Sequence, residues 1–251
     1  MTPPKDTPKA PKKVTQKAAK GQKMVAKVAE SARLKEDFLN AFLKQVPAHG
    51  WSEKALFEAA KVLKQPEAMA LALFVQKEKE VLEVWSRALD EAMVAKLQKL
   101  DLSKMKIRER IFWGVRVRLS LLEAHKEAAK AAFSFLCYPL NVPCVPPLLY
   151  ETTHHMWVAA GDTSTDYNFY TKRLLLAGVY VATFLYWLKD TSPEHHKTWK
   201  FLESRIENVL WLQKAKAVNP LEALKTLKDS PLKDLPFLKM MQHFWPFSGK
   251  P

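Results

Sequence analysis

The stretch that decides the fold runs from Trp157 to Arg173 and reads Trp157-Val-Ala-Ala-Gly-Asp-Thr-Ser-Thr-Asp-Tyr-Asn-Phe-Tyr-Thr-Lys-Arg173, followed by an apolar run over 174–188. Gly161 is expected to end one helix, and Thr163 with Asp166 three residues on resembles a capping box that starts the next. This run has apolar residues on every side of the helix, which is typical of a core helix or a membrane span. Its fifteen residues are fewer than the roughly 20 that a bilayer requires, so we expect a buried central helix.

The first two turns of this helix have a different character. Asp166, Phe169, Tyr170 and Arg173 fall on one face at the helical spacing of about 100° per residue. Two interpretations are open. The four residues form a solvated helix start with a surface ion pair, or they form a contact surface for another protein, which favours aromatic residues and arginine.

The same stretch carries a family resemblance. Together with Asp-Thr-Ser-Pro-Glu over 190–194 and the segment 198–206, it resembles the coenzyme Q (ubiquinone) biosynthesis accessory protein family over roughly 30–218. That resemblance implies a lipid-binding protein with a TetR-like fold that forms a homodimer. It also implies that the face at Asp166, Phe169, Tyr170 and Arg173 docks a membrane-bound di-iron demethoxyubiquinone hydroxylase. Most relatives have tryptophan in place of Phe169 and aspartate in place of His154.

The resemblance further implies a cavity that shelters an isoprenoid quinone intermediate or a phospholipid. Burial of the isoprenoid tail against apolar helices would drive binding. The small residues of the central helix either leave that space or allow close helix packing. We expect the cavity to be lined by Trp157, Leu176, Gly178, Val179 and Thr183.

Composition points to an all-α protein of one or two domains. The chain has 251 residues, 48% of them hydrophobic, and only six glycines. Few stretches alternate in the manner of strands, so a bundle of about nine or ten helices is expected. The net charge of +14 indicates a polyanionic partner, either nucleic acid or an anionic membrane surface. Cys137 and Cys144 match no zinc or redox spacing and are expected to be buried, reduced thiols.

The N-terminal residues divide into two parts. Residues 1–23 hold seven lysines, one aspartate and four prolines, which predicts a disordered basic arm. The arm is a solubilising tail or is attracted to acidic lipid head groups. It lacks the arginines of a mitochondrial transit peptide. The sequence shows neither a secretory signal nor a run of eighteen apolar residues. We therefore expect a peripheral protein on the cytoplasmic face of a bacterial inner membrane, or on the matrix side in a eukaryote.

Residues 24–75 predict three helices, over 24–46, 52–63 and 66–74, arranged like a helix-turn-helix with Ser52 as an N-cap. A DNA-reading version needs exposed basic and amide side chains on its recognition helix. The third helix carries only one charge, and that charge is acidic. No specific nucleic acid is therefore expected, although a TetR-like DNA-binding regulator stays the alternative.

Residues 76–218 form the expected lipid-binding and dimerisation bundle. Periodicity predicts helices over 78–98, 104–137, 147–160 and 193–217, in addition to the central helix. The expected starts use Asp101 and Ser103, Pro147 at the first helical position, and Thr191 with Glu194 as a capping box. The arginines of the 104–137 helix are expected to form a solvated or ion-paired face, with phospholipid head groups as the alternative partners; they are Arg108, Arg110, Arg116 and Arg118.

Residues 219–251 predict an amphipathic segment broken by prolines. Aromatic residues beside lysine suit a membrane interface. The residues expected to insert are Leu235, Phe237, Leu238, Met241, Phe244 and Trp245. Docking of this segment on the same protein or on a dimer mate is the open alternative.

No catalytic constellation is present in the sequence. There is no Gly-x-Ser-x-Gly motif, no glycine-rich phosphate loop and no Glu-x-x-His pair. The adjacent pairs His154-His155 and His195-His196 point in different directions on a helix, so neither predicts a metal site. We expect a binding protein without enzymatic activity, cofactor or metal.

Overall fold

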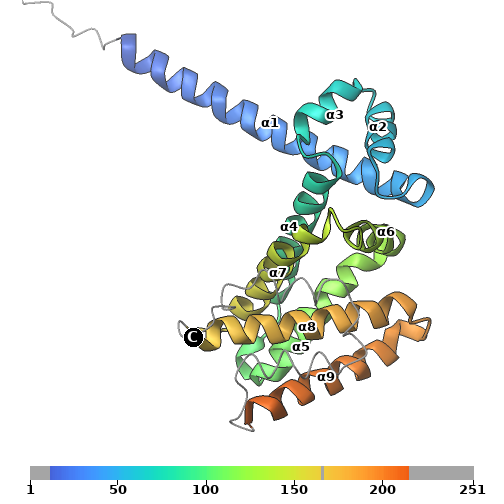
Figure 1. Ribbon diagram of the computed structural model, residues 1–251. Helices are drawn as coiled ribbons and strands as arrows, with labels where there is room; N and C mark the ends of the chain where they lie inside the picture. Colours follow the sequence, from blue (N-terminus) through green and yellow to red (C-terminus); the bar gives the residue numbers. More distant parts are fainter. Residues whose placement is uncertain (1–11, 165–166, 215–251) are drawn as a thin grey trace, which may run out of the picture.

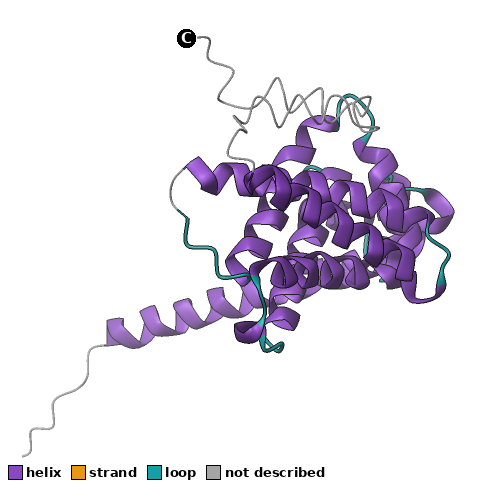
Figure 2. Cartoon of the chain, turned by 90° about the horizontal axis from the view of Figure 1, so that it is seen from below, coloured by secondary structure: helices purple, strands orange, loops and turns teal. Residues whose placement is uncertain are grey.

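The computed structural model describes residues 12–164 and 167–214, and this part of the chain consists of helices joined by turns and loops, without strands (Figures 1 and 2). The expected all-α fold is confirmed. The described residues form nine α-helices, which agrees with the expected number. They are α1 Lys12–His49, α2 Glu53–Val62, α3 Glu67–Leu73, α4 Glu78–Leu97, α5 Ile107–Leu122, α6 Lys126–Leu136, α7 Val145–Ala159, α8 Tyr167–Lys189 and α9 His196–Lys214.

Helices α1 to α3 form the N-terminal layer. The second half of α1 packs on α2 and α3, whereas its first half extends away from the other helices (Figure 1). Ser52 caps α2 as predicted, because its hydroxyl accepts a hydrogen bond from the Ala55 amide. Trp51 stacks on Trp85 of α4 with ring centroids 5.4 Å apart, which joins this layer to the rest of the bundle.

Helix α1 begins at Lys12, well before the expected start near residue 24. The expected disordered arm over 1–23 is therefore wrong for residues 12–23, and residues 1–11 lie outside the described chain. The physical reason is local propensity. Residues 12–23 are rich in lysine, alanine and glutamine, which lose little rotamer freedom in a helix.

The helix expected over 104–137 is divided into two. A 3₁₀ turn at Glu123–His125 separates α5 from α6. No proline or glycine marks this break in the sequence. Distant partners fix it instead: the Glu123 carboxylate accepts hydrogen bonds from the indole of Trp187 and meets the ring of His195. The expected cap at Asp101 and Ser103 also belongs to a separate 3₁₀ turn, Leu102–Lys104.

Helices α7, α8 and α9 follow the predicted order but differ at their starts. Pro146 and Pro147 lie in the first turn of α7, which begins at Val145, so Pro147 is not at the first position. Gly161 ends α7 as expected, with φ of +85°, a value that favours glycine. The start of α9 uses Asp190 in place of the expected Thr191: the Asp190 carboxylate accepts hydrogen bonds from the amide and hydroxyl of Thr198.

Helix α8 runs through the body of the molecule beside α9 (Figure 1). The expected central helix is buried along most of its apolar run, including Leu174, Leu176, Val179 and Trp187. It packs against α7 and α5 on its other sides. The core of the bundle therefore lies between α8 and the helices α4, α5 and α7.

Candidate functional site

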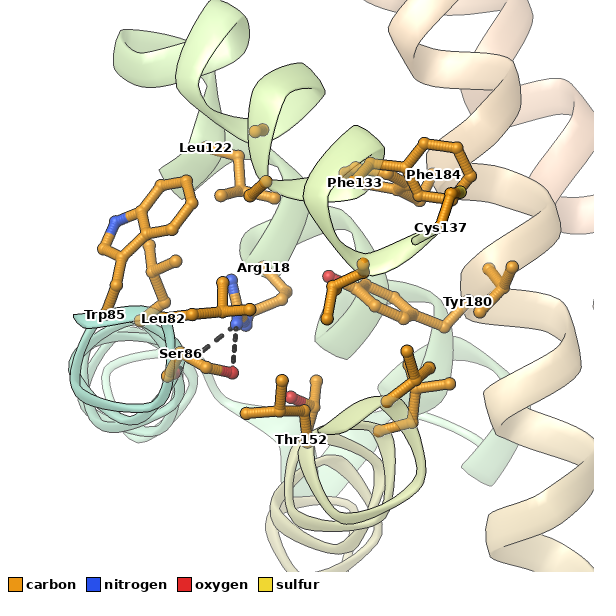
Figure 3. Close-up of a pocket in the computed structure, with 18 of the residues that line it drawn as sticks. Leu82, Trp85, Ser86, Arg118, Leu122, Phe133, Cys137, Thr152, Tyr180 and Phe184 are labelled. Atoms are coloured by element: carbon orange, nitrogen blue, oxygen red, sulfur yellow. Dashed lines mark hydrogen bonds between the residues drawn. The ribbon is translucent and has the colours of Figure 1, made fainter. Parts of the chain in front are cut away.

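An apolar cavity lies where α4, α5, α6, α7 and α8 converge (Figure 3). Its volume is about 160 Å³. Aliphatic and aromatic side chains make up most of its wall, and the polar members are few. The lining residues are Leu82, Trp85, Ser86, Leu89, Arg118, Leu122, Ala129, Ala132, Phe133, Leu136, Cys137, Val142, Val145, Leu148, Leu149, Thr152, Tyr180, Val181 and Phe184.

One polar cluster interrupts this apolar wall. The Nε atom of Arg118 donates to a carboxylate oxygen of Asp90 at 2.8 Å, and Thr152 donates its hydroxyl to the other oxygen at 3.0 Å. A terminal nitrogen of Arg118 also donates to the hydroxyl of Ser86 at 3.3 Å (Figure 3). Arg118 and Asp90 are 4% and 2% exposed, so the pair is desolvated and each charge depends on the other.

One buried donor of a pocket-lining residue has no partner among the described residues. The Nη1 atom of Arg118 is buried and makes no hydrogen bond. The ring of Tyr180 points from α8 into the cavity (Figure 3). Burial raises the pKa of Tyr180, so the phenol stays protonated and able to donate.

The sequence analysis missed the Asp90–Arg118 pair, although a signal was present. Asp90 directly follows Leu89 on the apolar stripe of its helix, and Arg118 lies three residues after Val115, with Leu122 four residues on. A charged residue in register with a buried stripe indicates a buried pair. Of the expected solvated or ion-paired arginine face, Arg118 is ion-paired, but it lies inside the bundle and not on a solvated face.

The expected lipid-lining residues do not line this cavity. Trp157, Leu176 and Val179 line a second, smaller cavity of about 40 Å³ between α5, α7, α8 and α9. Gly178 and Thr183 line neither cavity, and Thr183 donates its hydroxyl back to the Val179 carbonyl within α8. A helix that is apolar all round gives no sequence signal for which face meets empty space, so the sequence could not select the correct face.

The junction between α7 and α8 holds a second buried ion pair. The Asp162 carboxylate accepts from Lys172 at 2.8 Å and from Arg173 at 3.3 Å, and it also accepts from the hydroxyl of Ser164. The Nε atom of Arg173 donates to His154 at 3.2 Å. These contacts join α7 and the loop after it to the first turns of α8, so they fix the relative position of the two helices.

The residues expected to bind a protein partner fall into three environments. Asp166 lies outside the described residues. Tyr170 is 44% exposed and Phe169 is half-buried, whereas Arg173 is only 2% exposed. The expectation that Arg173 lies on an exposed face is wrong, because Asp162, His154 and the Phe169 carbonyl hold its guanidinium inside. The contact surface that remains accessible is the aromatic pair Phe169 and Tyr170.

Arg173 still shapes that aromatic pair. Its guanidinium carbon lies 3.3 Å from the centroid of the Phe169 ring, in a cation–π contact. The Phe169 and Tyr170 rings meet edge to face with centroids 5.1 Å apart. Arg173 therefore supports the pair from beneath, which fixes how Tyr170 is presented.

The surroundings at this junction shift the pKa values of His154 and Asp162. Burial lowers the pKa of His154, and the neighbouring charge of Arg173 lowers it further. For Asp162, burial alone would raise the pKa, but hydrogen bonds from Lys172 and Ser164 outweigh burial and lower it. His154 is therefore held neutral and accepts the Arg173 bond, while Asp162 is held charged.

Other expected features have mixed outcomes. Both cysteines are free thiols, but Cys137 is exposed and Cys144 is half-buried, so the expectation of buried thiols is wrong. Among the described residues no group of three metal-ligating side chains occurs, and no helix has the length and hydrophobicity to cross a bilayer. The expected membrane-binding residues lie outside the described chain; they are Leu235, Phe237, Leu238, Met241, Phe244 and Trp245.

The comparison with solved structures concerns the fold. A TetR transcriptional regulator from Nitrosomonas europaea superposes with a TM-score of 0.58, covering 71% of this chain and 99% of that one. The two sequences are 16% identical, so the likeness shows a TetR-like fold and nothing about function.

The sequence comparisons concern the family. Residues 142–213 match the COQ9 family. The human and bovine proteins named "Ubiquinone biosynthesis protein COQ9, mitochondrial" are 35% and 34% identical over 187 residues, which cover 71% of this chain and 58% of each relative. The chain therefore spans less than two thirds of the length of these relatives. The matched region covers nearly all of α7 to α9, and these matches show that the chain is similar to the COQ9 family.

Proposed function

We propose that this protein takes part in ubiquinone biosynthesis as an accessory protein that binds isoprenoid quinone intermediates. The observation that carries the proposal is the apolar cavity between α4 and α8. A cavity lined by apolar side chains with few polar groups is typical of a site for a largely apolar ligand. The names of the curated relatives supply the pathway. No side-chain constellation for catalysis is part of the proposal.

The size of the cavity limits how the ligand is held. A volume of about 160 Å³ resembles the engineered cavity of about 150 Å³ that binds benzene, so it admits one ring or a short piece of chain. A complete prenyl tail needs more space. Cys137 lines the cavity and is also exposed, so the cavity opens near the end of α6. The rest of the ligand would leave through this opening.

The surroundings of the opening favour contact with a membrane. Tyr138 and Leu140 follow Cys137 and are 66% and 86% exposed. Exposed apolar side chains on a protein of net charge +14 suit an anionic lipid surface. We place the protein peripherally, on the cytoplasmic face of a bacterial inner membrane or on the matrix side in a eukaryote, with residues 235–245 as a further membrane contact.

Lipid analysis of the purified protein tests the binding proposal. Extraction followed by mass spectrometry should recover an isoprenoid lipid or a phospholipid in near-stoichiometric amount. Ala132→Phe would fill the cavity and should abolish recovery, because Ala132 lies on its wall. Ala124→Phe adds the same ring at an exposed position and should change nothing. Absence of lipid from the wild-type protein, or equal lipid in both variants, would contradict the proposal.

The proposed protein partner is the di-iron demethoxyubiquinone hydroxylase of the same pathway. The support is the exposed Tyr170 ring, held beside Phe169 by Arg173. Aromatic residues of this kind dominate many protein interfaces. Tyr170→Ala should weaken pull-down of the hydroxylase about tenfold or more. Tyr138→Ala removes a more exposed tyrosine elsewhere and should leave the pull-down unchanged. Equal pull-down by both variants would remove the assignment.

We also propose a homodimer, formed through α8 and α9 as the TetR-like fold suggests. Sedimentation equilibrium of the full chain should give twice the monomer mass of 28.8 kDa. A monomer at micromolar concentration would contradict this part of the proposal.

DNA binding stays the alternative function. The described α3 contains Glu67 as its one charged residue, so a basic recognition surface is missing from that helix. A gel shift would detect sequence-selective duplex binding. Binding that is nonspecific and lost on deletion of residues 1–23 would dismiss a regulator.

A further inference from the structure

We propose that an outer apolar surface formed by α3, the turn after it and the α6–α7 loop (residues 137–144) is a membrane contact, and that its partner is a bilayer containing anionic lipid. The surface consists of Leu71, Val75, Tyr138 and Leu140. The inference rests on the proposed function and makes it more specific, because it states which side of the molecule faces the lipid. Cys137, which lines the cavity and is exposed, directly precedes Tyr138 in the same loop.

The first support is the exposure of these side chains. Leu140, Val75 and Tyr138 are the three most exposed large hydrophobic side chains of the described residues, at 86%, 78% and 66%. Leu71 on α3 is a further exposed member, at 37%. Apolar side chains that gather on one part of a surface mark a contact with another molecule or with a membrane.

A hydrogen bond holds the two parts of this surface together. Nζ of Lys79, in the first turn of α4, donates to the carbonyl oxygen of Leu140 at 3.2 Å, although 61 residues separate the two in the chain. Val75 lies four residues before Lys79, in the turn that joins α3 to α4. The connection between α6 and α7 lies beside the start of α4 (Figure 1). The exposed side chains of the two turns therefore belong to one surface.

The composition of the surface favours lipid over a protein partner. Leucine and valine are under-represented among the hot spots of protein interfaces, and lysine is depleted from such interfaces. Lys64, Lys77 and Lys79 lie in the turns at either end of α3 and at the start of α4. Lys77 pairs with Glu53, whereas Lys64 and Lys79 have no carboxylate partner in the part of the chain that the structure describes. Such lysines reach anionic head groups while the apolar side chains enter the bilayer interface.

The character of α3 argues against nucleic acid as the partner. In a helix-turn-helix, the second helix reads DNA with exposed basic and amide side chains. Here α3 has Glu67 as its one charged residue, and it exposes Leu71, with Val75 in the turn that follows. A phosphate backbone gives these two side chains no apolar phase to enter, whereas the acyl region of a bilayer does.

Vesicle flotation of the full chain tests this surface. Vesicles of phosphatidylcholine and phosphatidylglycerol, in a ratio of about two to one, supply the anionic interface. Val75→Glu and Leu140→Glu should each weaken binding about tenfold, the factor expected when burial of one aliphatic side chain is lost. Val158→Glu is the matched control, because Val158 is 54% exposed but lies at the other end of α7 from this loop, and it should leave binding unchanged.

A second measurement separates this surface from residues 235–245, which are also proposed to contact the membrane. Cys144→Ser leaves Cys137 as the sole thiol of the chain. A charged maleimide should modify Cys137 several-fold more slowly when the vesicles are added, because membrane contact at Tyr138 covers the neighbouring thiol. Val75→Glu in this background should remove most of the protection, whereas Val158→Glu should retain it.

The outcomes separate this inference from the proposed function. Weaker flotation and lost protection in Val75→Glu, with Val158→Glu unchanged, support the inference. Equal flotation of all variants, or a Cys137 that stays fully reactive on vesicles, overturns it even if the purified protein carries lipid. A dimer that dissociates in Leu140→Glu on sedimentation equilibrium overturns the membrane assignment in favour of a second copy of the chain. Absence of lipid from the purified protein contradicts the proposed function, whereas the vesicle measurements decide this inference.

Discussion

Two buried aspartate–arginine pairs in this molecule differ in whether all of their hydrogen-bond donors have partners. At the α7–α8 junction, Arg173 bonds to Asp162, His154 and a backbone carbonyl, and Asp162 also holds Lys172 and Ser164. In the α4–α8 cavity, Arg118 bonds to Asp90 and Ser86 but leaves Nη1 unpaired. The junction pair is satisfied and fixes the position of α8 on α7, whereas the Asp90–Arg118 pair leaves one buried donor unsatisfied.

The largest expected effect comes from breaking the cavity pair. Arg118→Ala leaves the Asp90 carboxylate buried without its counter-charge, so the free energy of unfolding should fall by about 3–5 kcal/mol. The double variant Asp90→Leu with Arg118→Leu should unfold near the wild-type urea midpoint, because apolar replacement of a buried pair is often neutral. If the single variant costs less than about 1 kcal/mol, the pair is not as desolvated as its burial implies.

A smaller effect is expected at the junction pair. Arg173→Ala removes one of several partners of Asp162, and Lys172 and Ser164 still hold that carboxylate. The expected loss in the free energy of unfolding is about 1.5–3 kcal/mol, the range for hydrogen bonds to charged groups. Urea titration of both alanine variants under the same conditions makes the comparison. A greater loss for Arg173→Ala than for Arg118→Ala would reverse the ranking of the two pairs.

The smallest expected effect is a pH dependence at the junction. The pKa of His154 is lower in the folded protein than in the unfolded chain, where histidine titrates near pH 6.5. The contribution of His154 to the free energy of unfolding is therefore fully present above about pH 6.5. It declines as the pH falls toward the pKa of the folded protein, because only the unfolded chain binds the proton in this range. The loss should be smaller than that caused by either alanine variant, because His154 is one of several partners of Arg173.

The substitution His154→Asp provides the check on this pH effect. It replaces the imidazole by a carboxylate, which stays charged beside Arg173 through this range. Thermal unfolding of the two proteins between pH 7 and pH 5 should show a smaller decline for the variant. An equal decline in both proteins would assign the pH dependence to other groups.

Local patterns account for the parts of the fold that could be predicted. Ser52 predicted the start of α2, Gly161 predicted the end of α7, and the apolar run after Arg173 predicted a central helix. Each of these features depends on a short-range preference: a hydroxyl that caps an amide, a residue that tolerates positive φ, or an uninterrupted apolar run. Distant contacts fix the 3₁₀ turn Glu123–His125. Periodicity alone therefore predicted a single long helix where the structure has two, α5 and α6.

The sequence by itself determined the helical class, most helix boundaries and the family likeness around Trp157 to Arg173. Only the tertiary structure decided which face of α8 meets the cavity, that Arg173 is inside, and that Asp90 and Arg118 form a pair across α4 and α5. The physical reason is that capping and helix propensity act over a few residues. Burial and charge pairing depend on groups 28 residues apart in the chain, such as Asp90 and Arg118, and packing alone brings these groups together.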